Sequence, residues 1–240
     1  GYAPPADLAA ICERFSSALE RFGYPPCPGR IMLSNPAWRM PAADFARTVR
    51  EWLVMPSPDS LMNLAIFLDA HAVAGDAALL AGVRDALGAL ATDNDMMLAR
   101  FAAAIDLFAG SGRWWHRLLG EGAERLDLKK EGIFPIVHGV RSLALAHRVA
   151  ETATTERLTR LVEAQALDTG MARDLGDALQ FLMMLRLKAG LAELEHDDAV
   201  SGAVEPARLS TLERDLLKDA LEVVKRFKAL LRQRFRLSAL

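Results

Sequence analysis

The sequence lacks the features that define several large classes of protein. It has only two cysteines, Cys12 and Cys27, in 240 residues, too few for a disulfide framework and at a spacing that matches no zinc motif, so buried, reduced thiols are expected. No stretch reaches the roughly 18 to 20 uninterrupted apolar residues of a membrane span. The N-terminus has no basic segment followed by an apolar signal core. These absences favour a cytoplasmic protein with no membrane partner.

An excess of charge of one sign is also lacking. Lysine and arginine together number 29 and the acids 31, which gives a formal net charge of -2. Without a global basic surface, extended binding to nucleic acid is not expected, although a local basic pocket is compatible with this balance. The content of 52% hydrophobic and 25% charged residues is that of an ordinary globular chain, long enough for one large domain or two small ones.

Signatures of common catalytic sites are missing as well. The serines show no nucleophile-elbow pattern, and the five histidines have no two-histidine metal spacing. No repeat at a fixed period is visible. The short "GSG" stretch is wrongly placed for a phosphate-binding loop and predicts a turn, followed by Trp114 and Trp115, which are expected to pack under the edge of the helical region.

The first 75 residues predict a small α/β unit. Helices are expected in "PPADLAAICERFSSALERFG" and "PAADFARTVREWL", where apolar residues recur at helical spacing. A short strand is expected at about residues 30–33. The apolar run "LMNLAIFLDAHAVAGD", residues 61–76, alternates with period two and predicts a second strand with Asp69 and His71 at its tip. Alternating helices and strands are typical of an α/β unit.

Asp69 has two interpretations at this point. A carboxylate at the C-terminal end of a buried strand often binds a metal or accepts a proton. It could equally be an acid that caps the loop leading into the next helix, because strand ends commonly carry turn-forming aspartate. The local pattern leaves both interpretations open.

From Asp76 onward the pattern predicts long helices. The clearest carries apolar residues at spacings of three and four from Leu209 to Leu230. The expected helices span about 76–91, 94–109, 134–151, 155–167, 170–195 and 209–235. Short connections and alanine-rich faces favour an antiparallel bundle. The predicted fold is therefore mainly α, with an α/β remnant at 1–75 and a helical bundle at 76–240.

The stretch "LDLKKEGIFPIVHGVRSLALAHR" contains the most unusual polar grouping. Lys129 and Lys130 are placed in a short extended segment before a predicted helix, on which His138 and Arg141 share a face. Lysines beside a helix N-terminus can bind phosphate, because free backbone N–H groups and the helix dipole add to their charge. The alternative is a solvated rim whose charge Glu131 partly offsets.

A family resemblance rests on five stretches in a fixed order: "GYPPCPGRIMLSNPAWR", "LAIFLDAHAVAGD", "LDLKKEGIFPIVHGVRSLAL", "LMMLRL" and "LSTLERDLLKDAL". Over essentially its whole length the chain resembles bacterial nucleotidyltransferases found downstream of cyclic-nucleotide-binding and CBS domains. That family is similar to glutamine synthetase adenylyltransferases. The resemblance implies a nucleotidyltransferase domain followed by a helical substrate-binding domain, with a nucleoside triphosphate and an unknown acceptor as substrates.

The resemblance also implies a metal centre. In such enzymes a Gly-Ser motif holds the nucleotide, two carboxylates bind two Mg²⁺ or Mn²⁺ ions, and a third carboxylate, aligned with Asp69, completes the site. Two metals need several anionic ligands. The chain starts at Gly1 without an initiator methionine and contains no Gly-Ser followed by Asp-x-Asp. We therefore expect a fragment that is inactive on its own.

The resemblance places further residues at the cleft between the two domains. Lys129 and Arg141 are expected to face this cleft, together with Lys130, His138 and the pair Ser34 and Asn35. The alternative to an enzyme is a non-catalytic module that relays ligand state from upstream regulatory domains. An incomplete sheet would also expose an edge, which predicts a homodimer.

Overall fold

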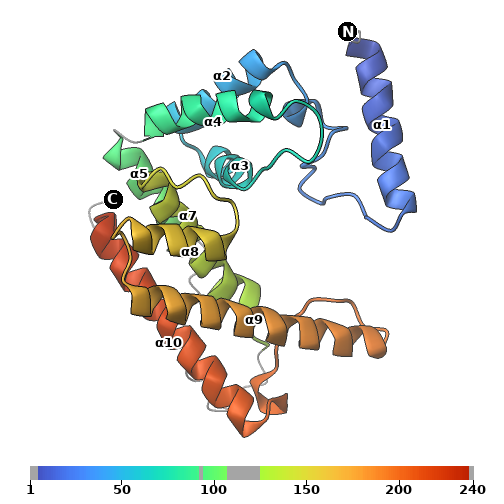
Figure 1. Ribbon diagram of the computed structural model, residues 1–240. Helices are drawn as coiled ribbons and strands as arrows, with labels where there is room; N and C mark the ends of the chain where they lie inside the picture. Colours follow the sequence, from blue (N-terminus) through green and yellow to red (C-terminus); the bar gives the residue numbers. More distant parts are fainter. Residues whose placement is uncertain (1–4, 92–93, 107–124, 238–240) are drawn as a thin grey trace.

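The computed structural model describes residues 5–91, 94–106 and 125–237. The secondary structure of these ranges is helical, apart from one isolated antiparallel bridge between Leu126 and Val204. The α-helices are α1 (Pro5–Arg21), α2 (Ala42–Val54), α3 (Pro58–Leu68), α4 (Ala77–Ala91), α5 (Asp95–Ala103), α7 (Phe134–Ala146), α8 (Thr154–Glu163), α9 (Thr169–Glu195) and α10 (Thr211–Arg234). The expectation of a mainly α fold is confirmed (Figure 1).

Both predicted strands are wrong. Residues 30–33 lie in an irregular loop, and residues 61–68 belong to α3. Helix α3 starts with a capping box: Ser57 accepts a hydrogen bond from the backbone N–H of Ser60 (3.1 Å), and Ser60 accepts one from the backbone N–H of Ser57 (2.6 Å). The α/β remnant is therefore not present in the described residues. The sheet edge that predicted a homodimer is missing there too, and a homodimer stays a prediction.

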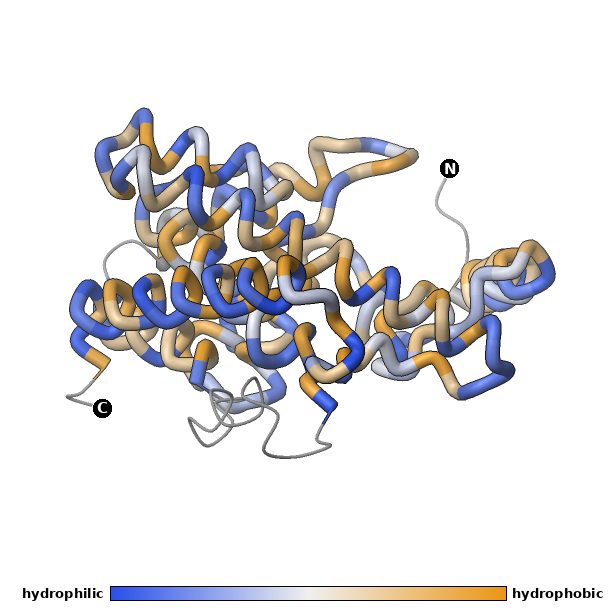
Figure 2. The backbone as a smooth tube through the Cα atoms, turned by 90° about the horizontal axis from the view of Figure 1, so that it is seen from below, coloured by the Kyte–Doolittle hydropathy of each residue, from blue (hydrophilic) through white to orange (hydrophobic). Residues whose placement is uncertain are grey.

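The larger hydrophobic core lies between α7, α8, α9 and α10. Helices α9 and α10 run in opposite directions and at an oblique angle to each other in Figure 1. At Gly139 of α7 an added Cβ atom would lie 2.4 Å from Leu231 and 2.6 Å from Phe227, so the glycine allows α7 and α10 to pack closely. Apolar residues recur among polar ones along the helices (Figure 2). This pattern lets each helix bury one face in the core and leave the other in solvent.

A smaller core joins α2, α3, α4 and α5. Its aromatic side chains are in contact, with 5.3 Å between the ring centroids of Phe45 and Phe67 and 6.0 Å between those of Phe45 and Trp52. Leu145 of α7 is buried in this core, whereas its neighbour Leu143 is buried in the larger one. Helix α7 therefore connects the two cores. The proposed domain boundary at residue 75 stays a prediction.

Some details differ from the expected pattern. Lys129 and Lys130 lie in a π-helical turn, Lys129–Ile133, that leads directly into α7, and not in an extended segment. Cys12 and Cys27 are free thiols, as expected, but the expectation that both are buried is wrong for Cys27, which is exposed. Three predicted features lie outside the described residues: the end of the helix expected at 94–109, the "GSG" turn, and the packing of Trp114 and Trp115. Among the described helices, none has the length and apolar character to cross a lipid bilayer.

Candidate functional site

Asp69 joins three helices through two buried arginines. It is the C-cap residue of α3. Its Oδ1 atom accepts hydrogen bonds from Nε of Arg141 in α7 (3.0 Å) and from Nη1 of Arg157 in α8 (2.7 Å), and its Oδ2 accepts one from Nη2 of Arg141. The side chains of Arg141 and Arg157 are 10% and 3% exposed. Asp69 is thus the counter-ion of two buried cations.

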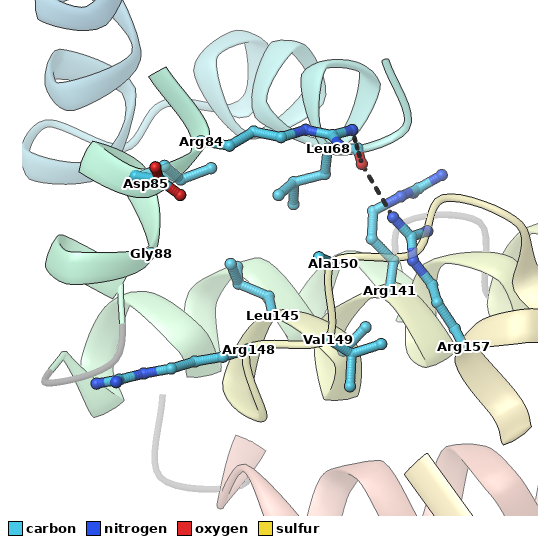
Figure 3. A pocket seen from close by; sticks show the side chains of 12 residues that line it. Leu68, Arg84, Asp85, Gly88, Arg141, Leu145, Arg148, Val149, Ala150 and Arg157 are labelled. Atoms are coloured by element: carbon cyan, nitrogen blue, oxygen red, sulfur yellow. Dashed lines mark hydrogen bonds between the residues drawn. The ribbon is translucent and has the colours of Figure 1, made fainter. Parts of the chain in front are cut away.

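Arg157 and Arg84 satisfy carbonyl groups at the open end of α3. Arg157 donates from Nη2 to the carbonyl oxygen of Leu68 (3.0 Å) and from Nε to that of Glu151 (2.7 Å). Arg84 of α4 donates to the carbonyl oxygen of Ala70 and, at 3.5 Å, to that of Leu68 (Figure 3). Carbonyl groups at a helix C-terminus carry partial negative charge, so cations are stabilised there.

His138 extends the network on α7. Its Nε2 atom lies 2.7 Å from the carbonyl oxygen of Phe101, and its Nδ1 lies 3.3 Å from Nη1 of Arg141. A carbonyl oxygen only accepts, so Nε2 carries the proton and Nδ1 accepts from Arg141. Burial lowers the pKa of His138 to about 4, more than the hydrogen bond to Phe101 raises it. The imidazole is therefore neutral at pH 7.

The carboxylate of Asp69 keeps its charge. Burial acts to raise the pKa of Asp69, but the hydrogen bonds and charges of Arg141 and Arg157 outweigh it, and the pKa is lowered from its ordinary value. With neutral His138, the group of Asp69, Arg141 and Arg157 carries one net positive charge.

A cavity of about 410 Å³ adjoins this network (Figure 3). Four arginines line it, and the carboxylate among its lining residues is that of Asp85. The lining residues are Leu68, Arg84, Asp85, Leu87, Gly88, Arg141, Ala144, Leu145, Arg148, Val149, Ala150 and Arg157. Counting Asp69 and Asp85, positive charges exceed negative ones by two. A partly enclosed site with such an excess attracts anions.

Arg148 is held in an unusual backbone conformation. Its φ angle is 56°, in the left-handed region, directly after α7 and its C-cap residue. The backbone N–H of Val149 donates to Ala144 (2.9 Å) and that of Arg148 to Leu145 (3.3 Å), the pattern of a Schellman motif. Glycine is the usual residue at this position, and a side chain there costs about 1 kcal/mol. The motif places the arginine at the cavity.

The structure brings together only some of the residues predicted from the sequence. Asp69, His138 and Arg141 form one network. Exposed Lys129 and Lys130 precede α7, at the end of the helix away from the cavity, and neither lines it.

Ser34 and Asn35 do not line the cavity either. Asn35 caps the 3-10 helix Pro36–Trp38: its side chain accepts from the backbone N–H of Ala37 (3.1 Å) and donates to the carbonyl oxygen of Arg30 (2.8 Å). These contacts give Asn35 a structural role in the turn.

Three arginines of the site, Arg84, Arg148 and Arg157, were not among the predicted site residues. Arg157 lies one helical turn before buried Leu161, so it interrupts the apolar face of α8. A charge in an apolar stripe is a signal of a paired cation that sequence reasoning could have used. Arg84 carries no such signal. Its partners are the backbone carbonyl groups of residues 68 and 70, and backbone groups leave no mark in the sequence.

The described residues do not fit a two-metal centre on their own. Among them, no group of three or more histidine, cysteine, aspartate or glutamate residues could hold a metal ion. Both carboxylate oxygens of Asp69 accept hydrogen bonds from guanidinium groups, which a metal ion would have to displace. The metal role of Asp69 stays a prediction.

Fold and site together define a helical protein with an arginine-lined cavity. Residues 95–235, more than half of the chain, match the family described as "putative nucleotidyltransferase substrate binding domain", and the chain belongs to this family. Residues 1–59 match the family described as "putative nucleotidyltransferase". The resemblance noted in the sequence is thereby confirmed. Searches of curated proteins and of solved structures gave no match.

The two matched ranges divide the site unequally. His138, Arg141, Arg148 and Arg157 lie in the substrate-binding range, whereas Asp69 lies between the two ranges. Most of the polar residues of the network and the cavity therefore lie in the range matched by the substrate-binding family.

Proposed function

We propose that the chain is the substrate-binding part of a metal-dependent nucleotidyltransferase and that its arginine-lined cavity binds the phosphate groups of a nucleoside triphosphate. In this reaction a nucleoside monophosphate passes from the triphosphate to an acceptor. The observation that carries the proposal is the cavity in which four arginines outnumber the carboxylates of Asp69 and Asp85. Membership of the family supports the type of reaction.

Guanidinium groups suit this ligand because their planar N–H pairs form double hydrogen bonds with phosphate oxygens. Asp69 holds Arg141 and Arg157 in position before any ligand binds. Less side-chain entropy is then lost on binding. The guanidinium group of Arg84 lies near those of Arg141 and Arg157, whereas that of Arg148 lies at the opposite end of the cavity (Figure 3). An extended triphosphate, and not a single phosphate group, would be needed to meet all four cations.

His138 contributes by positioning. Its neutral imidazole accepts a hydrogen bond from Arg141, whereas an imidazolium would repel the guanidinium group. Together, Asp69 and His138 engage three nitrogen atoms of Arg141. This arrangement fixes the plane of the guanidinium group at the wall of the cavity.

Mg²⁺ or Mn²⁺ would neutralise charge on the triphosphate during transfer. Since the described residues form no metal-binding cluster, the ligands would come from residues outside the described ranges or from another polypeptide. The proposal therefore assigns binding, and not catalysis, to this chain. We expect no transfer activity from the chain alone.

The proposal is tested by calorimetric titration of the chain with ATP, GTP, CTP and UTP, each compared with its nucleoside. We expect saturable binding of at least one triphosphate and none of the nucleosides. Arg148→Ala should weaken this binding at least about tenfold, the usual scale for the loss of a charge-assisted contact. Arg160→Ala is the matched control, because Arg160 is 55% exposed and pairs with Glu151 and Glu163.

Two results would contradict the proposal: no binding of any triphosphate at millimolar concentration, or equal affinity in Arg148→Ala and the parent. The alternative, a non-catalytic relay module, is distinguished by turnover. If the chain is such a module, nucleotide should bind but pyrophosphate should never be released, even when the cyclic-nucleotide-binding and CBS domains implied by the resemblance are present.

A further inference from the structure

A second cavity, also of about 410 Å³, lies between α3, α5 and α7. Its walls come from residues 56–65, from the end of α5 and from the start of α7, and it shares no lining residue with the arginine-lined cavity. His138 lines this second cavity and Arg141 lines the first, one turn further along α7. The volume lies within the roughly 300–1,000 Å³ range of small-molecule sites.

The inner wall of the second cavity presents carbon atoms. Its polar side chains are already hydrogen bonded: Ser57 is engaged in the capping box of α3, and both ring nitrogens of His138 have partners. Leu61 and Met62 supply apolar surface. A ligand buried here gains free energy from apolar contact. The inner wall offers it no polar group that lacks a hydrogen-bond partner.

Aromatic side chains form one end of the cavity. The side chains of Phe134 and His138 are stacked, with 5.2 Å between ring centroids and an angle of 9° between their planes. Phe101 lies on the other side of His138, with 4.6 Å between ring centroids, so both faces of the imidazole are covered. The stack therefore contributes ring edges to the wall, and a ligand ring can pack against such edges in an edge-to-face arrangement.

The charge at the cavity is positive. Arg100 of α5 is exposed at its rim, and no acid is among its lining residues. His138 is neutral at pH 7. An anionic group on the ligand would therefore meet Arg100 at the edge while the ring enters the apolar part.

We propose that this cavity binds a small aromatic acid, with its ring against Leu61, Met62 and the ring edge of Phe134 and its anionic group at Arg100. The site is separate from the proposed phosphate site, and the inference does not depend on nucleotide binding. Its probe is 1-anilinonaphthalene-8-sulfonate, an aromatic anion whose fluorescence rises in an apolar site, with displacement by 1-naphthoate and by its uncharged analogue 1-naphthalenemethanol.

We expect saturable binding of the fluorescent probe at one site per chain. Ala103→Phe, which fills the cavity from α5, should reduce affinity at least tenfold, whereas Ala43→Phe on the exposed surface of α2 should not change it. Met62→Trp fills the same cavity from α3. It replaces Ala103→Phe in the test if circular dichroism shows that Ala103→Phe is not folded.

The role of Arg100 has its own test. Arg100→Gln should weaken 1-naphthoate at least threefold and leave 1-naphthalenemethanol unchanged, with Arg50→Gln as an exposed control on α2. Arg148→Ala should leave probe binding unchanged, which separates this site from the arginine-lined cavity. The inference is overturned if the parent shows no saturable binding, if folded cavity-filled variants bind like the parent, or if Arg148→Ala abolishes probe binding.

Discussion

Arg141 and Asp69, 72 residues apart in the sequence, form a two-bond ion pair that connects α7 to the end of α3. Arg157 reaches the same carboxylate from a position 88 residues away. Since α3 belongs to the smaller core and α8 to the larger one, this carboxylate links the two packed regions. Loss of its charge should therefore affect stability as well as ligand binding.

Asp69→Asn should lower the free energy of unfolding by about 2 kcal/mol. The change leaves two buried arginines without their counter-ion, and the loss is smaller than for a fully buried pair because Asp69 is partly exposed. Urea unfolding measures the effect. Asp44→Asn is the control, since Asp44 forms an exposed ion pair with Arg47 and should change stability by less than about 0.5 kcal/mol. Equal stability of Asp69→Asn and the parent would contradict this role.

The same variant tests the metal role implied by the family resemblance. A lost metal ligand would reduce divalent-dependent transfer about 100-fold or more in a protein that contains the complete transferase domain, with little change in unfolding. A lost counter-ion would lower the free energy of unfolding in this chain, with no effect on Mn²⁺ binding measured by calorimetry. The two readouts separate the roles.

Arg157→Lys should be destabilising by about 2 kcal/mol. Lysine keeps the charge but cannot reach Asp69, Leu68 and Glu151 together, so buried acceptors lose their partners. Arg160→Lys, on the same helix, should stay within about 0.5 kcal/mol of the parent. Thermal unfolding followed by circular dichroism compares the two. A melting temperature for Arg157→Lys equal to that of Arg160→Lys would exclude the proposed geometry.

Acid should destabilise the chain through His138. Its pKa is about 4 in the folded protein and 6.5 in the ordinary, unfolded state. The unfolded state therefore binds the proton first, so stability is complete above about pH 6.5 and is lost as the pH falls toward about 4. The loss from this group amounts to about 3 kcal/mol at most.

His138→Gln removes that titration and should flatten the decline in unfolding free energy between pH 6.5 and 5, measured in urea at each pH. His196→Gln, at the exposed C-cap of α9, is the control. Identical pH profiles for the parent and His138→Gln would show that another group is responsible.

Two glycine substitutions should have opposite effects. Gly139→Ala places a methyl group against Phe227 and Leu231 and should destabilise the protein by about 2 kcal/mol, as overpacked cores do. Gly176→Ala in α9 meets no atom within 4 Å. It should stabilise the helix by about 0.5–1 kcal/mol, because alanine has the higher helix propensity. Similar melting temperatures for the two variants would show that α7 and α10 are not packed this closely.

Helix α10 illustrates what local sequence can determine. The expected range of 209–235 differs by two residues or fewer at each end from the observed Thr211–Arg234. Its start is set by Ser210 and Glu213, which form a capping box, and its apolar stripe repeats over several turns. Both signals lie within the helix itself, so they need no knowledge of distant residues.

Helix α3 illustrates the opposite case. Its short apolar run also fits a buried strand, and periodicity alone does not separate the two. The surroundings of this segment hide its helical pattern. Leu64, Ala65 and Phe67 are all buried, and a helix that is enclosed on several sides does not show the one-sided apolar pattern by which a surface helix is recognised.

Local patterns along the chain were sufficient to locate the long helices and to mark Asp69, His138 and Arg141 as unusual polar residues. Tertiary packing was needed to show that Asp69 pairs with Arg141 and Arg157 and that Arg84 and Arg148 complete a cavity. It was also needed to show that the cavity is not lined by Lys129, Lys130, Ser34 or Asn35. The physical reason is distance along the chain: helices form from contacts three or four residues apart, whereas these ion pairs join residues 72 and 88 positions apart and exist only once the helices have packed.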